Sequence, residues 1–329
     1  MTMAKPIEQH TPTANFLPHI LVRHRHLQTV LLTLHRPGQT NLRRVQQEMI
    51  LETAQGVRLQ GFFSPQPDQT KGIVLLLHGW LGCAESNYNT LLGEDLYRRG
   101  YAVFRVNYRD HGDTHQLNPG FFRGDLLDEL FDAAQQVARL AAPRPLHIIG
   151  VSLGGSFALR LAWRHAQTPI PTLGQTIAIN PAINPRLATL ALDRNPLYLH
   201  YFRSKWRASL KKKQALFPDR YDFAPELAAK SCMAMTETLM PRYSPHPDAQ
   251  SYFNSYQVTP AMLAGLTSPV TILTAADDPI VPVADFHALA GISPYLTLDI
   301  QPYGGHVGFI DLFPFRTWIT EYAARVLGG

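Results

Sequence analysis

The chain has 329 residues, of which 45% are hydrophobic and 17% charged, a balance that is typical of globular proteins and excludes a disordered chain. Its length is enough for one large α/β domain or for two ordinary domains. The formal net charge is +5, and two segments without acidic residues hold much of the excess: residues 19–44 with five arginines, and residues 203–213 with six lysines and arginines.

Basic segments of this kind can attract anionic lipid headgroups or nucleic acid. No nucleic-acid motif accompanies either segment, so we predict no nucleic-acid partner. A solvated basic surface is the simplest interpretation, and peripheral contact with an anionic membrane surface is the alternative. The oligomeric state is left open.

The two cysteines, Cys83 and Cys232, have neither metal-type spacing nor the density of a disulfide framework, which favours a reducing compartment. Residues 1–12 lack the apolar core of a secretory signal. No apolar run reaches the roughly 18 residues that a membrane-spanning helix needs. We therefore expect a soluble, cytoplasmic protein.

The first elements in chain order are an arm and an edge hairpin. Residues 1–44 are predicted to form an N-terminal arm packed on the domain. Two strand-like runs, 45–52 and 57–63, flank a Gln55-Gly56 turn and indicate an antiparallel hairpin at a sheet edge. The continuous apolar run 72–77 is typical of a central strand buried on both faces.

Strand-like and helix-like segments then alternate, which predicts a mostly parallel sheet covered by helices on both faces. Before residue 181 the expected helices are 87–99, 126–140 and the segment behind Ser152, and the expected strands are 101–106, 146–149 and 175–179. After residue 269 the expected strands are 270–274 and 296–301, and the expected helices are 284–290 and 307–326. We predict one core domain made of residues 45–181 and 269–329.

Residues 182–268 interrupt this alternation and are predicted to form an inserted helical cap. Phe202, Trp206 and Leu210 recur at four-residue spacing on one side of a helix. Basic residues occupy another side: Arg203, Arg207, Lys211 and Lys212. The alternative is that these helices are simply additions to the core.

The stretch from His147 to Arg160 contains Gly-X-Ser-X-Gly, with Ser152 at its centre, between a strand-like run and a helical pattern. A strand that turns sharply into a helix holds its corner residue in a strained conformation, and glycines two before and two after let the chains pass. The motif therefore predicts that Ser152 is an exposed nucleophile. In the alternative, Ser152 merely caps the helix.

A serine hydroxyl needs a base, and the base needs an orienting acid, in the chain order Ser, acid, His. Asp277 and Asp278 follow one strand-like run, and His306 follows another after two glycines. We select Asp278 because Pro279 fixes its turn, and we expect Asp277 to bond to backbone. His306 is the predicted base. The competing histidines lack this order and position: His24, His26, His111 and His115.

A tetrahedral intermediate needs N–H donors aimed at its oxyanion. We predict the backbone N–H groups of Leu153 and, from the loop after the run 72–77, of Trp80. His78 is expected to position that loop by hydrogen bonding. The candidates for the substrate pocket are His78, Trp80, Phe202 and Trp206, and no metal or cofactor is predicted.

Several motifs together resemble the α/β-hydrolase superfamily, and more narrowly the YheT/EMB8-like esterases with their animal ABHD1/ABHD3-type members. They are His26-Leu27-Gln28-Thr29, Leu77-His78-Gly79, Asn107-Tyr108-Arg109-Asp110-His111-Gly112, Val151-Ser152-Leu153-Gly154-Gly155, Asp277-Asp278-Pro279 and Gly304-Gly305-His306-Val307-Gly308-Phe309. Asp110 and Ser156 depart from the family, which usually has Gly and Asn there.

The resemblance implies the α/β-hydrolase fold and a carboxylic-ester hydrolase that uses Ser152, Asp278 and His306. It implies substrates among short- and medium-chain acyl esters, acylglycerols or phospholipids. The residues alone are consistent with hydrolysis through an acyl-enzyme. The alternatives are an acyltransferase of the same fold, in which an alcohol or thiol replaces water, and a non-catalytic binding protein.

Overall fold

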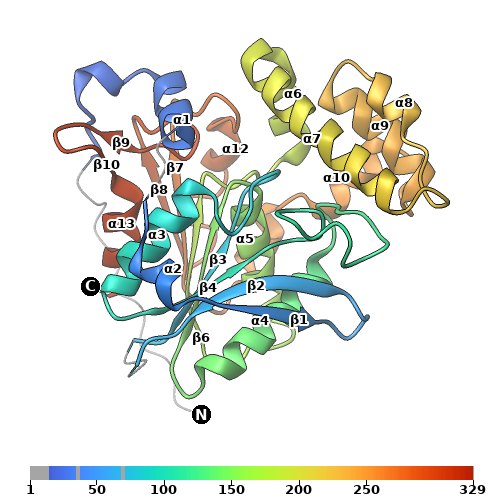
Figure 1. Cartoon of the computed structure of the whole chain (residues 1–329). Helices are drawn as coiled ribbons and strands as arrows, with labels where there is room; N and C mark the ends of the chain where they lie inside the picture. The colour runs from blue at the N-terminus through green and yellow to red at the C-terminus, as the bar shows by residue number, and fades with distance from the viewer. Residues whose placement is uncertain (1–14, 35–37, 68–70, 329) are drawn as a thin grey trace.

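The computed structural model describes residues 15–34, 38–67 and 71–328, and its centre is an eight-stranded sheet (Figure 1). The strand order is β1-β2-β4-β3-β5-β6-β7-β8. The strands are β1 (Gln47–Glu52), β2 (Arg58–Ser64), β3 (Ile73–Leu77), β4 (Ala102–Val106), β5 (Leu146–Val151), β6 (Leu173–Ile179), β7 (Val270–Ala275) and β8 (Leu296–Gln301). Within this sheet the pairs β1/β2 and β2/β4 are antiparallel, and the remaining pairs are parallel. The predicted mostly parallel sheet with an antiparallel edge hairpin is confirmed.

Helices cover both faces of the sheet. Two of them, α4 (Leu127–Ala141) and α5 (Leu153–His165), share a hydrophobic cluster with every second residue of β3, beginning at Ile73. The intervening residues of β3 join the cluster under α3 (Asn87–Arg98) and α13 (Trp318–Val326). β3 is buried along its whole length, which is why its sequence is apolar without alternation.

Several predicted boundaries differ from the observed ones; the predicted helix 284–290, for example, ends at His287. Two further differences have a clear physical cause. The predicted helix 307–326 begins only at Trp318, after a short hairpin of β9 (Ile310–Asp311) and β10 (Arg316–Thr317). Val307, Phe309 and Phe313 have positive φ, which breaks a helix, and Pro314 has no N–H to donate. The predicted strand 45–52 begins at Gln47, because α2 (Asn41–Val45), whose N-cap is Thr40, occupies the preceding residues.

Six helices lie between β6 and β7 in the chain. They are α6 (Pro185–Arg194), α7 (Pro196–Leu216), α8 (Ala224–Ala228), α9 (Cys232–Tyr243), α10 (Ala249–Tyr256) and α11 (Pro260–Ala264). In Figure 1, α6 to α10 stand over one end of the sheet. The short α12 (Ala284–His287) follows β7. The division of the chain into a core and a cap of residues 182–268 remains a prediction.

The described part of the N-terminal arm packs on the domain through η1 (Ile20–Val22) and α1 (Arg25–Leu34). Gln28 of α1 is fully buried and bonds to the backbone of Val22 and of Ile310. Residues 1–14, which include the segment tested for a secretory signal, lie outside the described residues. Within the described ranges, no helix has both the length and the apolar character required to cross a membrane.

Candidate active site

Ser152 occupies the corner between β5 and α5, with φ +56° and ψ −117°. A Cβ on Gly150 would lie 2.0 Å from the carbonyl oxygen of Gly154, and one on Gly154 would lie 2.1 Å from that of Leu77. Neither position admits a side chain unless the backbone moves. The two glycines therefore allow β5, α5 and the end of β3 to approach one another closely. The strained corner is the geometry that presents a serine hydroxyl above a sheet edge.

The three predicted groups meet in one hydrogen-bonded line. His306 Nε2 lies 2.9 Å from Ser152 Oγ, and His306 Nδ1 lies 2.8 Å from Asp278 Oδ2. Because a carboxylate can only accept, Nδ1–H donates to Asp278 and the Nε2 lone pair faces the serine hydroxyl. This arrangement can remove the serine proton as the oxygen attacks a carbonyl carbon.

The structure also separates the two candidate acids. The Asp278 side chain is fully buried, and its Oδ1 accepts from the backbone N–H groups of Ile280 and Val281 at 2.8 and 3.0 Å. Asp277 instead accepts from the backbone N–H of Gly305 at 2.9 Å, and burial raises the pKa of its carboxyl. Asp277 thus holds the loop that carries His306, and Asp278 holds the imidazole.

Asn180, which the sequence analysis missed, links the acid to the histidine loop. It follows β6 with φ +43° and is fully buried. Its Nδ2 donates to Asp278 Oδ2 at 2.7 Å and to the carbonyl oxygen of Gly305 at 3.2 Å. Its place at a strand end and the tolerance of Asn for positive φ are the signals that could have marked it.

The N–H of Trp80 lies in a loop whose neighbouring N–H groups are both occupied. Gly79 N–H donates to Tyr88 Oη at 2.8 Å, and Leu81 N–H donates to His111 Nε2 at 3.1 Å. No hydrogen-bond partner among the described residues takes the N–H of Trp80 or of Leu153. A Cβ on Gly79 would lie 3.4 Å from Ser152 Cβ, so this loop borders the nucleophile. The arrangement suits two free donors for an oxyanion.

Buried histidines and a tyrosine fix this loop. His111, which was only a weak candidate base, donates from Nδ1 to the carbonyl oxygen of Arg109 at 2.7 Å, and burial lowers its pKa to about 4. The neutral ring therefore keeps Nε2 free to accept from Leu81. Burial raises the pKa of Tyr88 to about 12, so its hydroxyl stays protonated. Nothing in the sequence around Tyr88 signals its role.

His78 does not line the cavities described below. It is fully buried and bonds through Nδ1 to its neighbour's carbonyl oxygen, that of Gly79, at 2.8 Å, and through Nε2 to Tyr108 N–H at 3.4 Å. Burial holds its pKa well below the usual value. His78 therefore lies beneath the loop and bonds to its backbone, whereas the sequence analysis also named it as a candidate for the substrate pocket; it is not among the residues that line either cavity.

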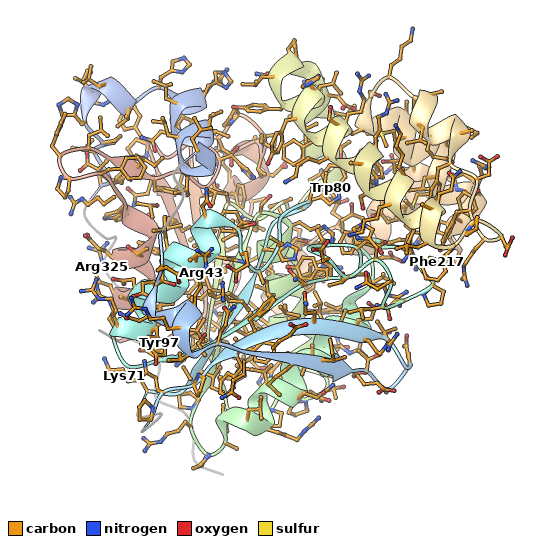
Figure 2. The ribbon with its side chains drawn as sticks, viewed as in Figure 1. Arg43, Lys71, Trp80, Tyr97, Phe217 and Arg325 are labelled. Carbon is orange, nitrogen blue, oxygen red and sulfur yellow. The ribbon has the colours of Figure 1, made fainter. Side chains whose placement is uncertain are left out.

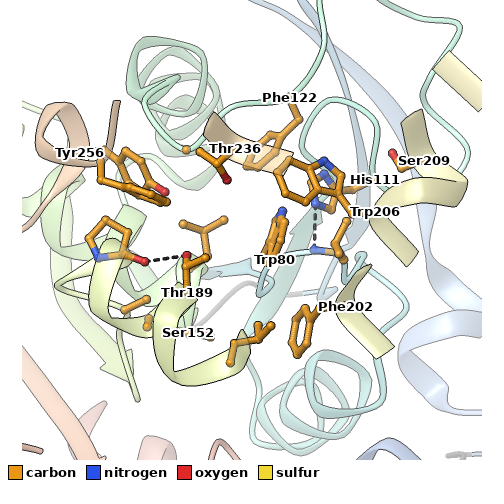
Figure 3. A pocket seen from close by; sticks show the side chains of 18 of the residues that line it. Trp80, His111, Phe122, Ser152, Thr189, Phe202, Trp206, Ser209, Thr236 and Tyr256 are labelled. Atoms are coloured by element: carbon orange, nitrogen blue, oxygen red, sulfur yellow. Dashed lines mark hydrogen bonds between the residues drawn. The ribbon is translucent and has the colours of Figure 1, made fainter. Parts of the chain in front are cut away.

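A largely apolar cavity opens beside Ser152 and His306 (Figure 3). Trp80 stacks on Phe202 with ring centroids 5.6 Å apart and meets the edge of Trp206 at 5.1 Å. Figure 2 shows Trp80 where the core meets α7. These three predicted pocket residues line the cavity, together with side chains that include Phe122, Leu153, Met240, Tyr252 and Tyr256.

A buried ion pair joins α7 to the core at this cavity. Lys213 Nζ lies 2.8 Å from Asp110 Oδ1, with side chains that are 1% and 7% exposed. Lys213 also donates to the carbonyl oxygens of His115 and Asn118. Asp110 has φ +57°, a conformation that favours glycine. The resembled family usually has Gly at this position, and in this chain Asp110 instead provides the carboxylate that pairs with Lys213.

The described residues contain no cluster of three or more His, Cys, Asp or Glu side chains that could hold a metal ion. Cys83 and Cys232 are both free thiols.

The fold and the Ser152–His306–Asp278 geometry are typical of α/β-hydrolases, and the comparison with known families agrees with this class. The model of the alpha/beta hydrolase family matches residues 74–324, and the chain belongs to that family. The predicted superfamily and fold are thereby confirmed.

Individual relatives narrow the resemblance. The chain is 29% identical to "Putative esterase slr0264" of Synechocystis over 79% of this chain and 76% of that protein. It is 23% identical to "Putative esterase YheT" of Escherichia coli over 94% of both. The Pyrococcus furiosus esterase Pf2001 has the same fold, with a TM-score of 0.59, 16% identity, and coverage of 88% of this chain and 94% of that one. The predicted likeness to YheT-type proteins is confirmed.

Proposed function

We propose that the protein is a carboxylesterase-type serine hydrolase that cleaves acyl esters through an acyl-enzyme. The observation that carries the proposal is the unbroken line from Ser152 Oγ through the His306 ring to Asp278, at 2.9 and 2.8 Å. The relatives from Synechocystis and Escherichia coli are both named as esterases, which supports the same activity.

Acylation begins when Ser152 Oγ attacks the ester carbonyl carbon while His306 Nε2 accepts the hydroxyl proton. The Leu153 and Trp80 N–H groups donate to the oxyanion of the tetrahedral intermediate. His306 then gives its proton to the leaving alcohol as the carbon–oxygen bond breaks. Asp278 keeps the imidazole in the required tautomer and stabilises its charged form.

Deacylation repeats the sequence with water as the nucleophile. His306 accepts a proton from water, the hydroxyl oxygen adds to the acyl carbon, and Ser152 leaves with the proton that His306 returns. The apolar lining of the cavity favours acyl chains as its occupant, and short- and medium-chain esters are the substrate class we assign.

A series of p-nitrophenyl esters from acetate to dodecanoate tests this function. Ser152→Ala is expected to lower kcat by a factor on the order of 10⁶. A fluorophosphonate probe should label the wild-type serine and leave the variant unlabelled. Equal turnover by wild type and Ser152→Ala would overturn the proposal, whereas ester product formed from added alcohols would redirect it to acyl transfer.

A further inference from the structure

A second cavity meets the first at the reacting groups. Trp80, Phe202, Ser152 and His306 line both cavities, so the Trp80–Phe202 stack forms part of the boundary between them. The second cavity extends between the arm and α7, and its further lining includes Thr29 of α1, Tyr201 and Lys205 of α7, and Val307.

The direction of proton transfer assigns an end of the ester to each cavity. His306 must deliver its proton to the leaving oxygen, so the alcohol departs on the side of that ring. Val307, next to His306, and Thr29, which accepts from His306 N–H at 2.9 Å, line only the second cavity. Leu153, at the start of α5, lines only the first. The acyl chain thus fits the first cavity and the alcohol fits the second.

The charges in the two cavities differ. In the first, Asp110 and Lys213 neutralise one another. Of the described residues that line the second, none is acidic, and Lys205 carries the one permanent charge. Lys205 Nζ donates to the carbonyl oxygen of Leu81 at 2.8 Å and to Tyr201 Oη at 3.2 Å, and no carboxylate of the described chain pairs with it. An ammonium has three N–H donors, so one remains for a ligand.

We propose that the second cavity binds the leaving alcohol of esters whose alcohol carries an anionic group, a phosphate or a carboxylate, and that Lys205 is the side chain that recognises it. The proposal rests on the esterase function above. Hydrolysis itself is unchanged: the ester carbon–oxygen bond breaks, water supplies the hydroxyl of the acid, and the released alcohol keeps its anion beside Lys205. Because Lys205 is exposed to solvent, its contribution to selectivity is modest and falls with salt.

The test compares esters that share one acyl chain, of the length that the p-nitrophenyl series selects. They are the 1-acylglycerol, the 1-acylglycerol 3-phosphate and the 3-acylglycerate, so phosphate and carboxylate are examined separately. We expect wild type to favour at least one anionic ester by about five- to tenfold in kcat/KM at low salt, and Lys205→Gln to abolish the preference. Lys205→Gln removes the charge, and a selectivity ratio is insensitive to a general loss of activity.

Lys211→Gln is the matched control, because Lys211 is exposed on the same helix and lines neither cavity. It removes the same charge and should leave the ratio as in wild type. Three results would overturn the proposal. The first is equal kcat/KM of wild type for neutral and anionic esters, and the second is a preference for anionic esters that persists in Lys205→Gln. The third is an enzyme that hydrolyses p-nitrophenyl esters but does not turn over the anionic esters. The esterase function would fail separately, through activity that survives in Ser152→Ala.

Discussion

Thr29 in the N-terminal arm accepts a hydrogen bond from the backbone N–H of His306, with 2.9 Å between Thr29 Oγ1 and His306 N. The same hydroxyl donates to the carbonyl oxygen of Arg25 at 2.8 Å, so it cannot rotate freely. A residue 277 positions away in the chain thereby fixes the backbone that carries the proposed base. Thr29 acts through His306 and is a positioning residue.

Thr29→Val should lower kcat about tenfold with little change in KM for a p-nitrophenyl ester, because the isosteric side chain cannot accept from His306 N–H and the ring loses part of its alignment. Thr29→Ser keeps the acceptor and should restore most of the activity. Thermal unfolding of both variants provides the control for folding. A Thr29→Val enzyme with wild-type kcat would show that the contact does not position the base.

Gln28 secures the arm itself, through three hydrogen bonds to buried backbone. Its Nε2 donates to the carbonyl oxygens of Val22 and Ile310, and its Oε1 accepts from Ile310 N–H. Gln28→Leu would leave these groups unsatisfied, so the free energy of unfolding should fall by about 2–4 kcal/mol. Urea denaturation measures this change. Gln250→Leu is the control, because the exposed Gln250 of α10 donates only to the side chain of Asn254, and it should change stability far less.

Much of the fold and of the candidate site could be predicted from local patterns. The apolar run of β3 predicted a buried strand, and each of the three proposed reacting groups follows a strand-like run in the sequence. Because parallel strands end at one edge of a sheet, that position alone implied that Ser152, Asp278 and His306 could meet.

The bonding partners of the supporting residues could not be predicted this way. Thr29, Asn180 and Tyr88 act through contacts with residues far along the chain or in another loop, and no local pattern encodes such contacts. The hairpin before α13 was missed for a related reason. The backbone that leads into the hairpin has positive φ at Val307 and Phe309. It passes close to α1 there, and a Cβ on Gly308 would lie 2.0 Å from the carbonyl oxygen of Gln28.

Tyr88→Phe tests whether the loop that carries Trp80 needs the hydrogen bond from Gly79 to Tyr88 as well as the one from Leu81 to His111. The variant loses the oxygen that accepts from Gly79 N–H, so the free N–H of Trp80 should shift and the oxyanion should be less well stabilised. We expect kcat to fall roughly tenfold, less than the 10²–10³ typical of losing an oxyanion donor outright.

Tyr97→Phe is the matched control for Tyr88→Phe. It lies on the same helix, and its hydroxyl donates to Pro65, away from the cavities. Steady-state rates with one p-nitrophenyl ester compare the two. If both variants match wild type, the tyrosine hydroxyl does not contribute to catalysis.

His147 provides a test of how stability depends on pH. It is buried on β5, accepts from Gln175 N–H at 3.0 Å, and has a pKa lowered by burial to about 4. The unfolded chain has an ordinary histidine pKa near 6.5 and therefore binds the proton first as pH falls. The stability that the neutral ring contributes is thus complete above about pH 6.5 and is lost between about 6.5 and 4.

His147→Gln should flatten this dependence. Between pH 6 and pH 5 nearly one proton fewer is taken up on unfolding, so the slope of the unfolding free energy should decrease by about 1 kcal/mol per pH unit. Urea denaturation at pH 7.5, 6 and 5 measures the slope for wild type and variant. The comparison isolates His147 because the other buried histidines, such as His111, remain in both proteins. Parallel curves would mean that the folded protein does not exclude a proton from this ring.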